Sequence, residues 1–262
     1  MRIAMFTDSF YPELGGIQDS ILANIRELGA RGHRIMLFAP AAARRDFQRL
    51  GLEPHEPEVG SNVAIRRLPS LPLPSSSQQS RLVIPTGRAA RALKAFRPDL
   101  IHVHTFFGAG LEALHAARRL HVPLVGTNHW YAQGFDLYAP IGRKTFRQFC
   151  GHALARFYNH CDWVTAPSRF TLDDLHAHGM NRRARVISNP INTYQFRPAT
   201  ATERQQLKGR LRLGDSVVVY AGRLAREKRI DVILHAIAVA RARVPDISLV
   251  IAGHGSDRTR LE

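Results

Sequence analysis

Residues 217 to 231 read VVVYAGRLAREKRID, and this stretch indicates both a fold class and a kind of ligand. The β-branched run from Val217 to Val219 predicts a buried parallel strand that ends at Gly222. Arg223 and Lys228 follow in the loop that leads into the next helix. In an open α/β sheet, ligands bind at the carboxyl ends of strands, where helix N-termini present free N–H groups. Two cations there suit a diphosphate, although a solvated basic turn before an amphipathic helix accounts equally well for the spacing.

Short apolar runs alternate with helical stretches along most of the chain, which predicts βαβ units and a mostly parallel sheet. The predicted strands of the first part are residues 2–7, 34–39, 63–68, 100–104, 124–127, 163–166 and 185–188. The main predicted helices between them are residues 17–30, 85–96, 110–120 and 142–160. Residues 69–80 are rich in Pro and Ser and predict an exposed loop.

A domain boundary is expected near NPINTYQFRPAT, residues 189–200. Residues 1–192 then form an amino-terminal domain, and residues 193–262 form a linker and the beginning of a second domain. In that second part we expect a helical segment, a strand over 216–221, a helix over 230–243 and a strand over 247–252. About 65 residues fall short of the ~100 of an ordinary domain, so the second domain is expected to be incomplete. Two strands make a poor isolated sheet.

The bulk composition restricts the class of protein. The chain has 262 residues, 45% hydrophobic content, only two cysteines and a net charge of +16. No apolar run approaches the ~20 residues that span a bilayer. Two cysteines give no disulfide framework, and no secretory leader is visible, so we expect a cytoplasmic protein. The positive charge favours anionic partners: a membrane surface, nucleic acid or phosphorylated ligands.

Several motifs, in order along the chain, resemble those of family 4 retaining glycosyltransferases, which are nucleotide-sugar enzymes of the GT-B fold. Besides residues 217–231, the matching segments are MRIAMFTDSFYPELGGIQDS (1–20), GTNHW (126–130), CDWVTAPS (161–168) and VISNPINTYQFRP (186–198). The resemblance implies an α/β protein with a complete amino-terminal Rossmann-like domain and an incomplete second one. It also implies a Glu-x-x-x-x-x-x-x-Glu element that this sequence does not reach, so we expect a chain truncated within the donor domain.

The resemblance assigns roles to individual residues. Arg223 and Lys228 match the residues that contact the donor's diphosphate, and Gly15 and Gly16 lie near the donor's phosphate and sugar. Glycines at a strand-to-helix turn let a phosphate approach the backbone closely, although a plain turn gives the same pattern. His129 in GTNHW matches the active-site histidine that contacts the transferred sugar. The alternative for His129 is a satisfied core histidine.

Three other polar residues are weaker candidates. Asp8, at the end of the first strand, either hydrogen-bonds the acceptor or caps a neighbouring helix. His102 and His104 share one face of a strand, as metal ligands can. No nearby cysteine or carboxylate completes a tetrahedral set, so we favour packing or edge roles for them. No metal site and no cofactor are expected, since the nucleotide diphosphate sugar is a substrate.

Two helical stretches are basic and amphipathic. In IPTGRAARALKAFRPD the cations recur every three residues: Arg88, Arg91, Lys94 and Arg97. In residues 142–160 an apolar stripe (Phe146, Phe149, Ala153, Leu154, Phe157) lies beside Arg143, Lys144, Arg147 and Arg156. Either helix suits an anionic bilayer, and ordinary solvated faces explain the same patterns. No nucleic-acid motif is visible, so no nucleic-acid partner is expected.

The predicted function is retaining transfer of a hexose from a nucleotide diphosphate sugar to an acceptor, with a glycerolipid favoured because lipid-modifying members of the family use a comparable basic face. The protein would then be peripheral at the inner face of the plasma membrane. Two alternatives remain. One is a catalytically impaired fragment that binds nucleotide or anionic membrane. The other is a sugar-nucleotide epimerase of related fold, which would release free nucleotide with no acceptor present.

Overall fold

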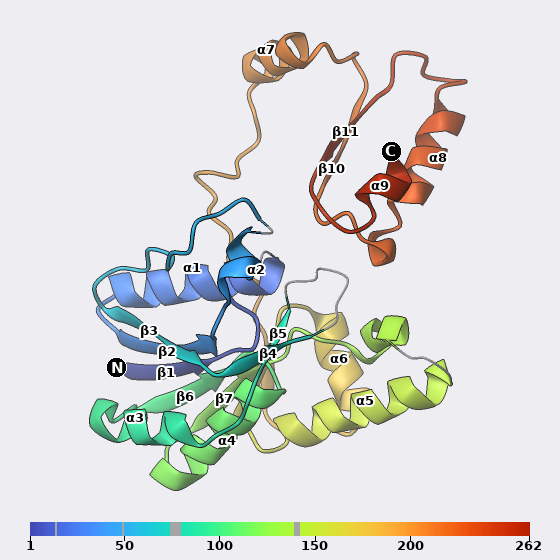
Figure 1. Cartoon of the computed structure of the whole chain (residues 1–262). Helices are drawn as coiled ribbons and strands as arrows, with labels where there is room; N and C mark the ends of the chain where they lie inside the picture. The colour runs from blue at the N-terminus through green and yellow to red at the C-terminus, as the bar shows by residue number, and fades with distance from the viewer. Residues whose placement is uncertain (14, 49, 74–79, 139–141) are drawn as a thin grey trace. The chain divides into compact units, whose positions relative to one another are not determined.

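The computed structural model describes residues 1–13, 15–48, 50–73, 80–138 and 142–262 (Figure 1). These residues fall into two compact units that divide between Pro190 and Ile191. The division lies close to the boundary predicted after residue 192.

The first unit contains a seven-stranded sheet in which every neighbouring pair is parallel. Its order is β3-β2-β1-β6-β7-β8-β9. The strands are β1 (Arg2–Phe6), β2 (Arg34–Pro40), β3 (Val63–Leu68), β6 (Leu100–Val103), β7 (Leu124–Thr127), β8 (Trp163–Ala166) and β9 (Ala184–Val186). This confirms the predicted α/β class. The order reverses between β1 and β6, and such a switch point opens a crevice at the carboxyl ends of the strands.

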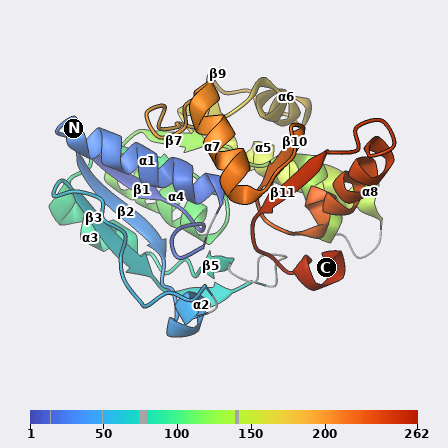
Figure 2. The same ribbon diagram turned by 90° about the horizontal axis from the view of Figure 1, so that it is seen from above.

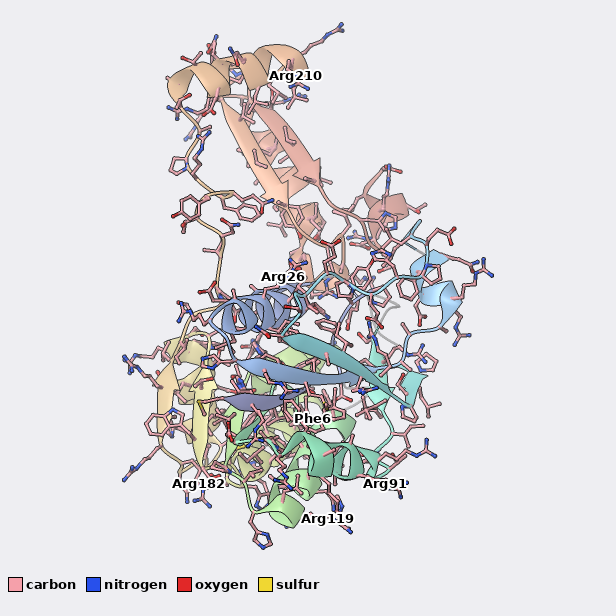
Figure 3. All side chains as sticks on the ribbon, turned by 90° about the vertical axis from the view of Figure 1, so that its left-hand side faces the viewer. Phe6, Arg26, Arg91, Arg119, Arg182 and Arg210 are labelled. Atoms are coloured by element: carbon pink, nitrogen blue, oxygen red, sulfur yellow. The ribbon has the colours of Figure 1, made fainter. Side chains whose placement is uncertain are left out.

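Helices cover both faces of this sheet (Figures 1 and 2). They are α1 (Gly16–Ala30), α2 (Arg44–Gln48), α3 (Arg88–Phe96), α4 (Gly108–Leu120), α5 (Arg143–Tyr158) and α6 (Arg169–Ala177), with a 3-10 helix η1 (Ala132–Tyr138). Strand residues alternate between the faces, so β1 contributes Ile3 and Met5 to the core under α1. Ala4 and Phe6 enter the larger core with α3, α4, α5 and α6. In Figure 3, Phe6 lies inside the unit.

Helix α6 is absent from the main predicted helices, although its sequence carries a start signal. Ser168 is its N-cap, and the Ser168 side chain accepts a hydrogen bond from the Thr171 amide at 3.2 Å. The short helix α2 is not among the predicted helices either, whereas α1, α3, α4 and α5 begin and end within three residues of the predicted bounds.

The prediction of a loop over residues 69–80 is wrong at its start. Ser70–Pro72 form β4, which pairs antiparallel with β5 (Arg81–Val83). The Arg81 guanidinium donates to the Ser70 hydroxyl and carbonyl, and it also forms an ion pair with Asp46 at 2.8 Å. These contacts span many residues and are not visible in local composition. Residues 74–79 of the predicted loop lie outside the described residues.

The second unit contains α7 (Ala201–Leu211), β10 (Val217–Ala221), a 3-10 helix η2 (Arg226–Lys228), α8 (Ile230–Ala240), β11 (Ser248–Ala252) and α9 (Arg258–Leu261). β10 and β11 pair in parallel, as predicted. The prediction that Val217–Val219 are buried is wrong, because Val219 is 64% exposed. Within the described residues β10 pairs only with β11, and one strand pair with one long apolar helix cannot bury both of its faces.

Candidate functional site

The turn around His129 is fixed by its neighbours. His129 lies two residues after β7, and the Tyr158 hydroxyl of α5 donates to the Thr127 carbonyl at the strand's end (3.0 Å). Asn128 is fully buried and bonds the next turn twice, accepting from the Trp130 amide (3.0 Å) and donating to the Trp130 carbonyl (2.7 Å). The backbone on both sides of His129 is therefore held in place.

Three histidine side chains meet at the carboxyl ends of β6 and β7. Nδ1 of His104 lies 3.3 Å from Nε2 of His129, and the two rings are stacked. The His102 and His104 rings are closer still, with centroids 4.2 Å apart. Nε2 of His102 lies 2.7 Å from the hydroxyl oxygen of Thr127. Sequence reasoning missed this cluster, and the edge role considered for His102 and His104 is wrong because β6 is flanked by β1 and β7.

Burial keeps these rings neutral at pH 7. It lowers the pKa of His129 to about 4, and together with the nearby His129 it lowers the pKa of His102 to about 4. His104 is only 1% exposed, and burial holds its pKa well below the usual value. Two buried ring nitrogens, Nε2 of His104 and Nδ1 of His129, have no hydrogen-bond partner among the described residues. In that part of the chain no three His, Cys, Asp or Glu side chains are placed to hold a metal ion.

Asp8 lies at the switch point, and its carboxylate is hydrogen-bonded to groups of the surrounding protein. Its carboxylate accepts from the Thr105 hydroxyl (2.7 Å), the Val83 amide (2.8 Å) and the Ala109 amide (3.1 Å). Ala109 is in the first turn of α4, where a negative charge also suits the helix dipole. The side chain is 3% exposed, and burial raises its pKa. This geometry favours the capping role over contact with an acceptor.

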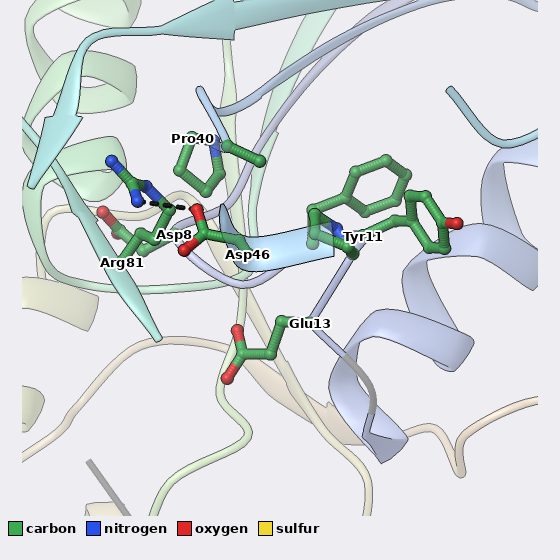
Figure 4. A pocket seen from close by; sticks show the side chains of 9 residues that line it. Asp8, Tyr11, Glu13, Pro40, Asp46 and Arg81 are labelled. Carbon is green, nitrogen blue, oxygen red and sulfur yellow. Dashed lines mark hydrogen bonds and ion pairs between the residues drawn. The ribbon is translucent and has the colours of Figure 1, made fainter. Parts of the chain in front are cut away.

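A small pocket opens beside Asp8 (Figure 4). Asp8, Tyr11, Glu13, Asp46 and Arg81 contribute its polar lining. Arg81 and Asp46 form an ion pair with only 11% and 6% of their side chains exposed. This pocket could not be predicted from local sequence, because its lining comes from segments far apart in the chain.

The glycine turn begins α1. Gly15 is the N-cap with an extended backbone, and no side chain caps the helix. A side chain on Gly16 would meet nothing within 4 Å, so packing does not require glycine there. The first amides of α1 therefore keep their donor capacity at the carboxyl edge of the sheet.

The loop after β10 carries both predicted phosphate ligands. Arg223 lies 3.5 Å from Glu227 in a half-exposed ion pair, and its carbonyl accepts from the Tyr220 hydroxyl (2.8 Å). Lys228 is exposed and lies in η2, one short turn before α8. Both cations are accessible to solvent.

The same loop packs backbone to backbone against the turn after β11. The Leu224 amide donates to the His254 carbonyl at 3.0 Å. A Cβ on Gly253 would lie 1.9 Å from the Gly222 carbonyl oxygen, and one on Gly255 would lie 2.2 Å from that of Leu224. Glycine is needed at 253 and 255 because the two turns approach so closely.

Helix α3 separates its charges cleanly from its apolar residues. Ala89, Ala90 and Leu93 are buried. The four predicted membrane-facing cations, Arg88, Arg91, Lys94 and Arg97, are all exposed, and Figure 3 shows Arg91 at the surface. No helix in the described residues is long and apolar enough to span a membrane.

The predicted apolar stripe of α5 is only partly correct. Leu154 and Phe157 pack into the core, but Phe149 is 70% exposed. Arg147 bonds Asp136 of η1 and so does not belong to a free basic face.

Comparison with known proteins identifies the family. Residues 14–195 match the model of Glycosyltransferase Family 4, and residues 202–262 match that of Glycosyl transferases group 1. A GDP-mannose-dependent alpha-mannosyltransferase of Mycobacterium tuberculosis is 30% identical over all of this chain and 65% of its own length. An alpha-monoglucosyldiacylglycerol synthase of Streptococcus pneumoniae is 27% identical over 97% of this chain and 56% of its own length.

Solved structures show the same fold. A HepE protein of Anabaena, determined with UDP-glucose, gives a TM-score of 0.66 at 16% identity, covering 97% of this chain and 61% of its own. A sucrose-phosphate synthase of Thermosynechococcus elongatus gives a TM-score of 0.68 at 18% sequence identity, and the match covers 99% of this chain and 66% of that protein's chain. The chain spans 56% to 65% of the length of the curated relatives it matches. The chain belongs to glycosyltransferase family 4 and has the architecture of the GT-B fold.

Proposed function

We propose that the chain forms the acceptor-side domain and the first part of the donor domain of a retaining glycosyltransferase that moves a hexose from a nucleotide diphosphate sugar to a membrane lipid. The observation that carries the proposal is His129, held at the carboxyl end of β7 with a buried ring nitrogen that has no partner in the described residues. Such an atom is ready to bond a polar ligand. Relatives named for GDP-mannose and for monoglucosyldiacylglycerol support the donor and acceptor classes.

The site chemistry follows from the charge states. A neutral His129 can donate to or accept from a sugar hydroxyl but does not supply a proton as an acid at pH 7. Arg223 and Lys228 neutralise the charge that develops on the departing diphosphate. The amides at Gly16 and the residues after it add donors for phosphate or sugar oxygens. The acceptor hydroxyl attacks the anomeric carbon of the sugar from the same face as the one from which the diphosphate departs.

The α3 face provides the membrane contact. Each lysine or arginine near an anionic surface contributes about 1 kcal/mol. Arg88, Arg91, Lys94 and Arg97 together would contribute about 4 kcal/mol, roughly a thousandfold in partitioning. We expect binding to vesicles with anionic lipid and little binding to neutral ones. The fourfold substitution of these cations by glutamine should abolish the difference.

Donor-dependent transfer tests the enzymatic part. UDP- and GDP-sugars are screened against diacylglycerol and phospholipid acceptors, with the 262-residue chain and with any longer product of its coding sequence. The double variant Arg223→Ala, Lys228→Ala should lose at least about 100-fold in kcat. The matched control is Arg204→Ala, Arg210→Ala, which removes two exposed cations from α7 of the same unit.

Full turnover by the first double variant would contradict the assignment of the two cations. Vesicle binding without transfer by any version would favour the membrane-binding alternative. Release of free nucleotide without an acceptor would favour the epimerase.

A further inference from the structure

We propose that His104 is a positioning residue that couples the tautomer of His129 to its own, so that the two rings act as one hydrogen-bonding pair. The proposal rests on the proposed function for its role in transfer, because His129 is expected to contact the sugar. Its structural part stands on the geometry of two side chains in the first unit.

Neutral imidazole carries one N–H and one lone pair, and this restricts the pair. Nδ1 of His104 faces Nε2 of His129 at 3.3 Å. One of these two atoms must carry the proton, since two N–H groups would clash and two lone pairs would repel. If His129 carries it on Nε2, then His104 carries its own on Nε2. If His104 carries it on Nδ1, then His129 carries its own on Nδ1.

Both rings must therefore hold the same tautomer. The two outer nitrogens, Nδ1 of His129 and Nε2 of His104, then always have opposite functions, one as donor and the other as acceptor. These are the two buried imidazole nitrogens that have no hydrogen-bond partner among the described residues. The pair thus has one unpaired donor at one end and one unpaired acceptor at the other.

The surroundings keep the pair in this form. The His102 ring lies beside the His104 ring at a tilt of 38°, and its own Nε2 contacts the hydroxyl of Thr127, which in turn contacts the Thr165 hydroxyl at 2.7 Å. These contacts hold His102 in place and use neither outer nitrogen. Burial disfavours the charged form of each ring, so the one-proton count holds at pH 7.

The test reads the tautomers directly. The ring nitrogens of the 15N-histidine-labelled chain are measured by NMR at pH 7, and the His104 and His129 signals are assigned from the spectra of His104→Phe and His129→Gln. We expect the two rings to show the same tautomer. In His104→Phe, the His129 ring loses its hydrogen-bonding partner, so its tautomer ratio and its ring-nitrogen shifts should change. Opposite tautomers in the unmodified chain, or an unchanged His129 in the variant, would overturn the proposal.

A conservative variant separates positioning from folding. Asn places an amide at the reach of Nδ1, so His104→Asn can still bond Nε2 of His129, whereas His104→Phe cannot. In donor-dependent transfer, His104→Phe should lower kcat about 10- to 100-fold with little change in the donor KM, and His104→Asn should recover most of it. Equal losses in both variants would contradict the role in transfer. If the proposed function is wrong, His129→Ala should keep full transfer activity, whereas His104 and His129 of the unmodified chain should still show the same tautomer by NMR.

Discussion

Replacing Asp8 by alanine separates the two roles considered for this residue. Its carboxylate satisfies the amides of Val83 and Ala109 and the Thr105 hydroxyl, and all three residues are at most 1% exposed. Alanine leaves both amides buried without an acceptor, at about 1 to 3 kcal/mol each. Removing a carboxylate that is costly to bury returns part of that loss. The net destabilisation expected is about 2 to 4 kcal/mol.

Asparagine should cost less than alanine at the same position. Oδ1 of Asp8 faces the Val83 amide at 2.8 Å and the Ala109 amide at 3.2 Å, so a carbonyl oxygen there can serve both. The amide nitrogen in place of Oδ2 no longer accepts from the Thr105 hydroxyl and lies close to the Ala109 N–H. We expect Asp8→Asn to lower the unfolding free energy by about 1 kcal/mol, less than Asp8→Ala does.

The pH dependence has a definite sign. Burial raises the native pKa of Asp8 above its unfolded value, so the native state binds the proton more readily. The unfolding free energy of the unmodified chain, relative to Asp8→Asn, should therefore rise as the pH falls from 7 toward 4.

Urea unfolding followed by tryptophan fluorescence measures these changes. The chain has two tryptophans, Trp130 and Trp163, both in the first unit, so the signal reports that unit alone. With a slope of about 3 kcal/mol per molar urea, the Asp8→Ala midpoint should fall by about 1 M. Glu58→Ala, which removes an exposed carboxylate, is the control. If Asp8→Ala matched the control in stability yet lost transfer activity, the capping argument would be refuted and the acceptor role supported.

Three further outcomes are expected. The first unit should lose stability as the pH falls from about 6.5 toward 4, because burial depresses the native pKa values of His102, His104 and His129 below their unfolded values. His129→Gln should make this dependence shallower in the same urea assay. Gly253→Ala should speed amide hydrogen exchange in β10 and β11, because the new Cβ would meet a carbonyl oxygen at 1.9 Å. The control is Gly209→Ala in α7, where the new Cβ meets open space, and this variant should slow exchange or leave it unchanged. A thiol reagent should label Cys150 before Cys161, because Cys161 is 1% exposed and burial raises its pKa to about 12; equal rates would count against this packing.

The sheet of the first unit could be predicted from the sequence because its strands are buried on both faces. Such strands are continuous apolar runs, and their predicted bounds differ from the observed ones by at most two residues. The glycine turn before α1 and the position of His129 at a strand end follow from the same pattern.

The contacts that define the site could not be predicted from local pattern. Asp8 meets Val83 and Ala109 from 75 and 101 residues away, and His104 meets His129 from 25 residues away. The alternation of His102 and His104 indicated a shared face but not what lies opposite them. Similarly, β-branching at Val217–Val219 predicted a strand correctly, but burial depends on neighbours that composition does not specify.

The close fit of the two turns in the second unit makes the position of Arg223 dependent on the turn after β11. Its loop has little room to move. The Leu224 amide is bonded to the His254 carbonyl, and the carbonyl oxygens of Gly222 and Leu224 lie close to Gly253 and Gly255. An insertion or a larger residue in that second turn would shift the guanidinium without altering it. Under the donor-binding role proposed for Arg223 and Lys228, variation in diphosphate affinity among related proteins should therefore follow the length and glycine content of the turn after β11 as closely as it follows the cations themselves.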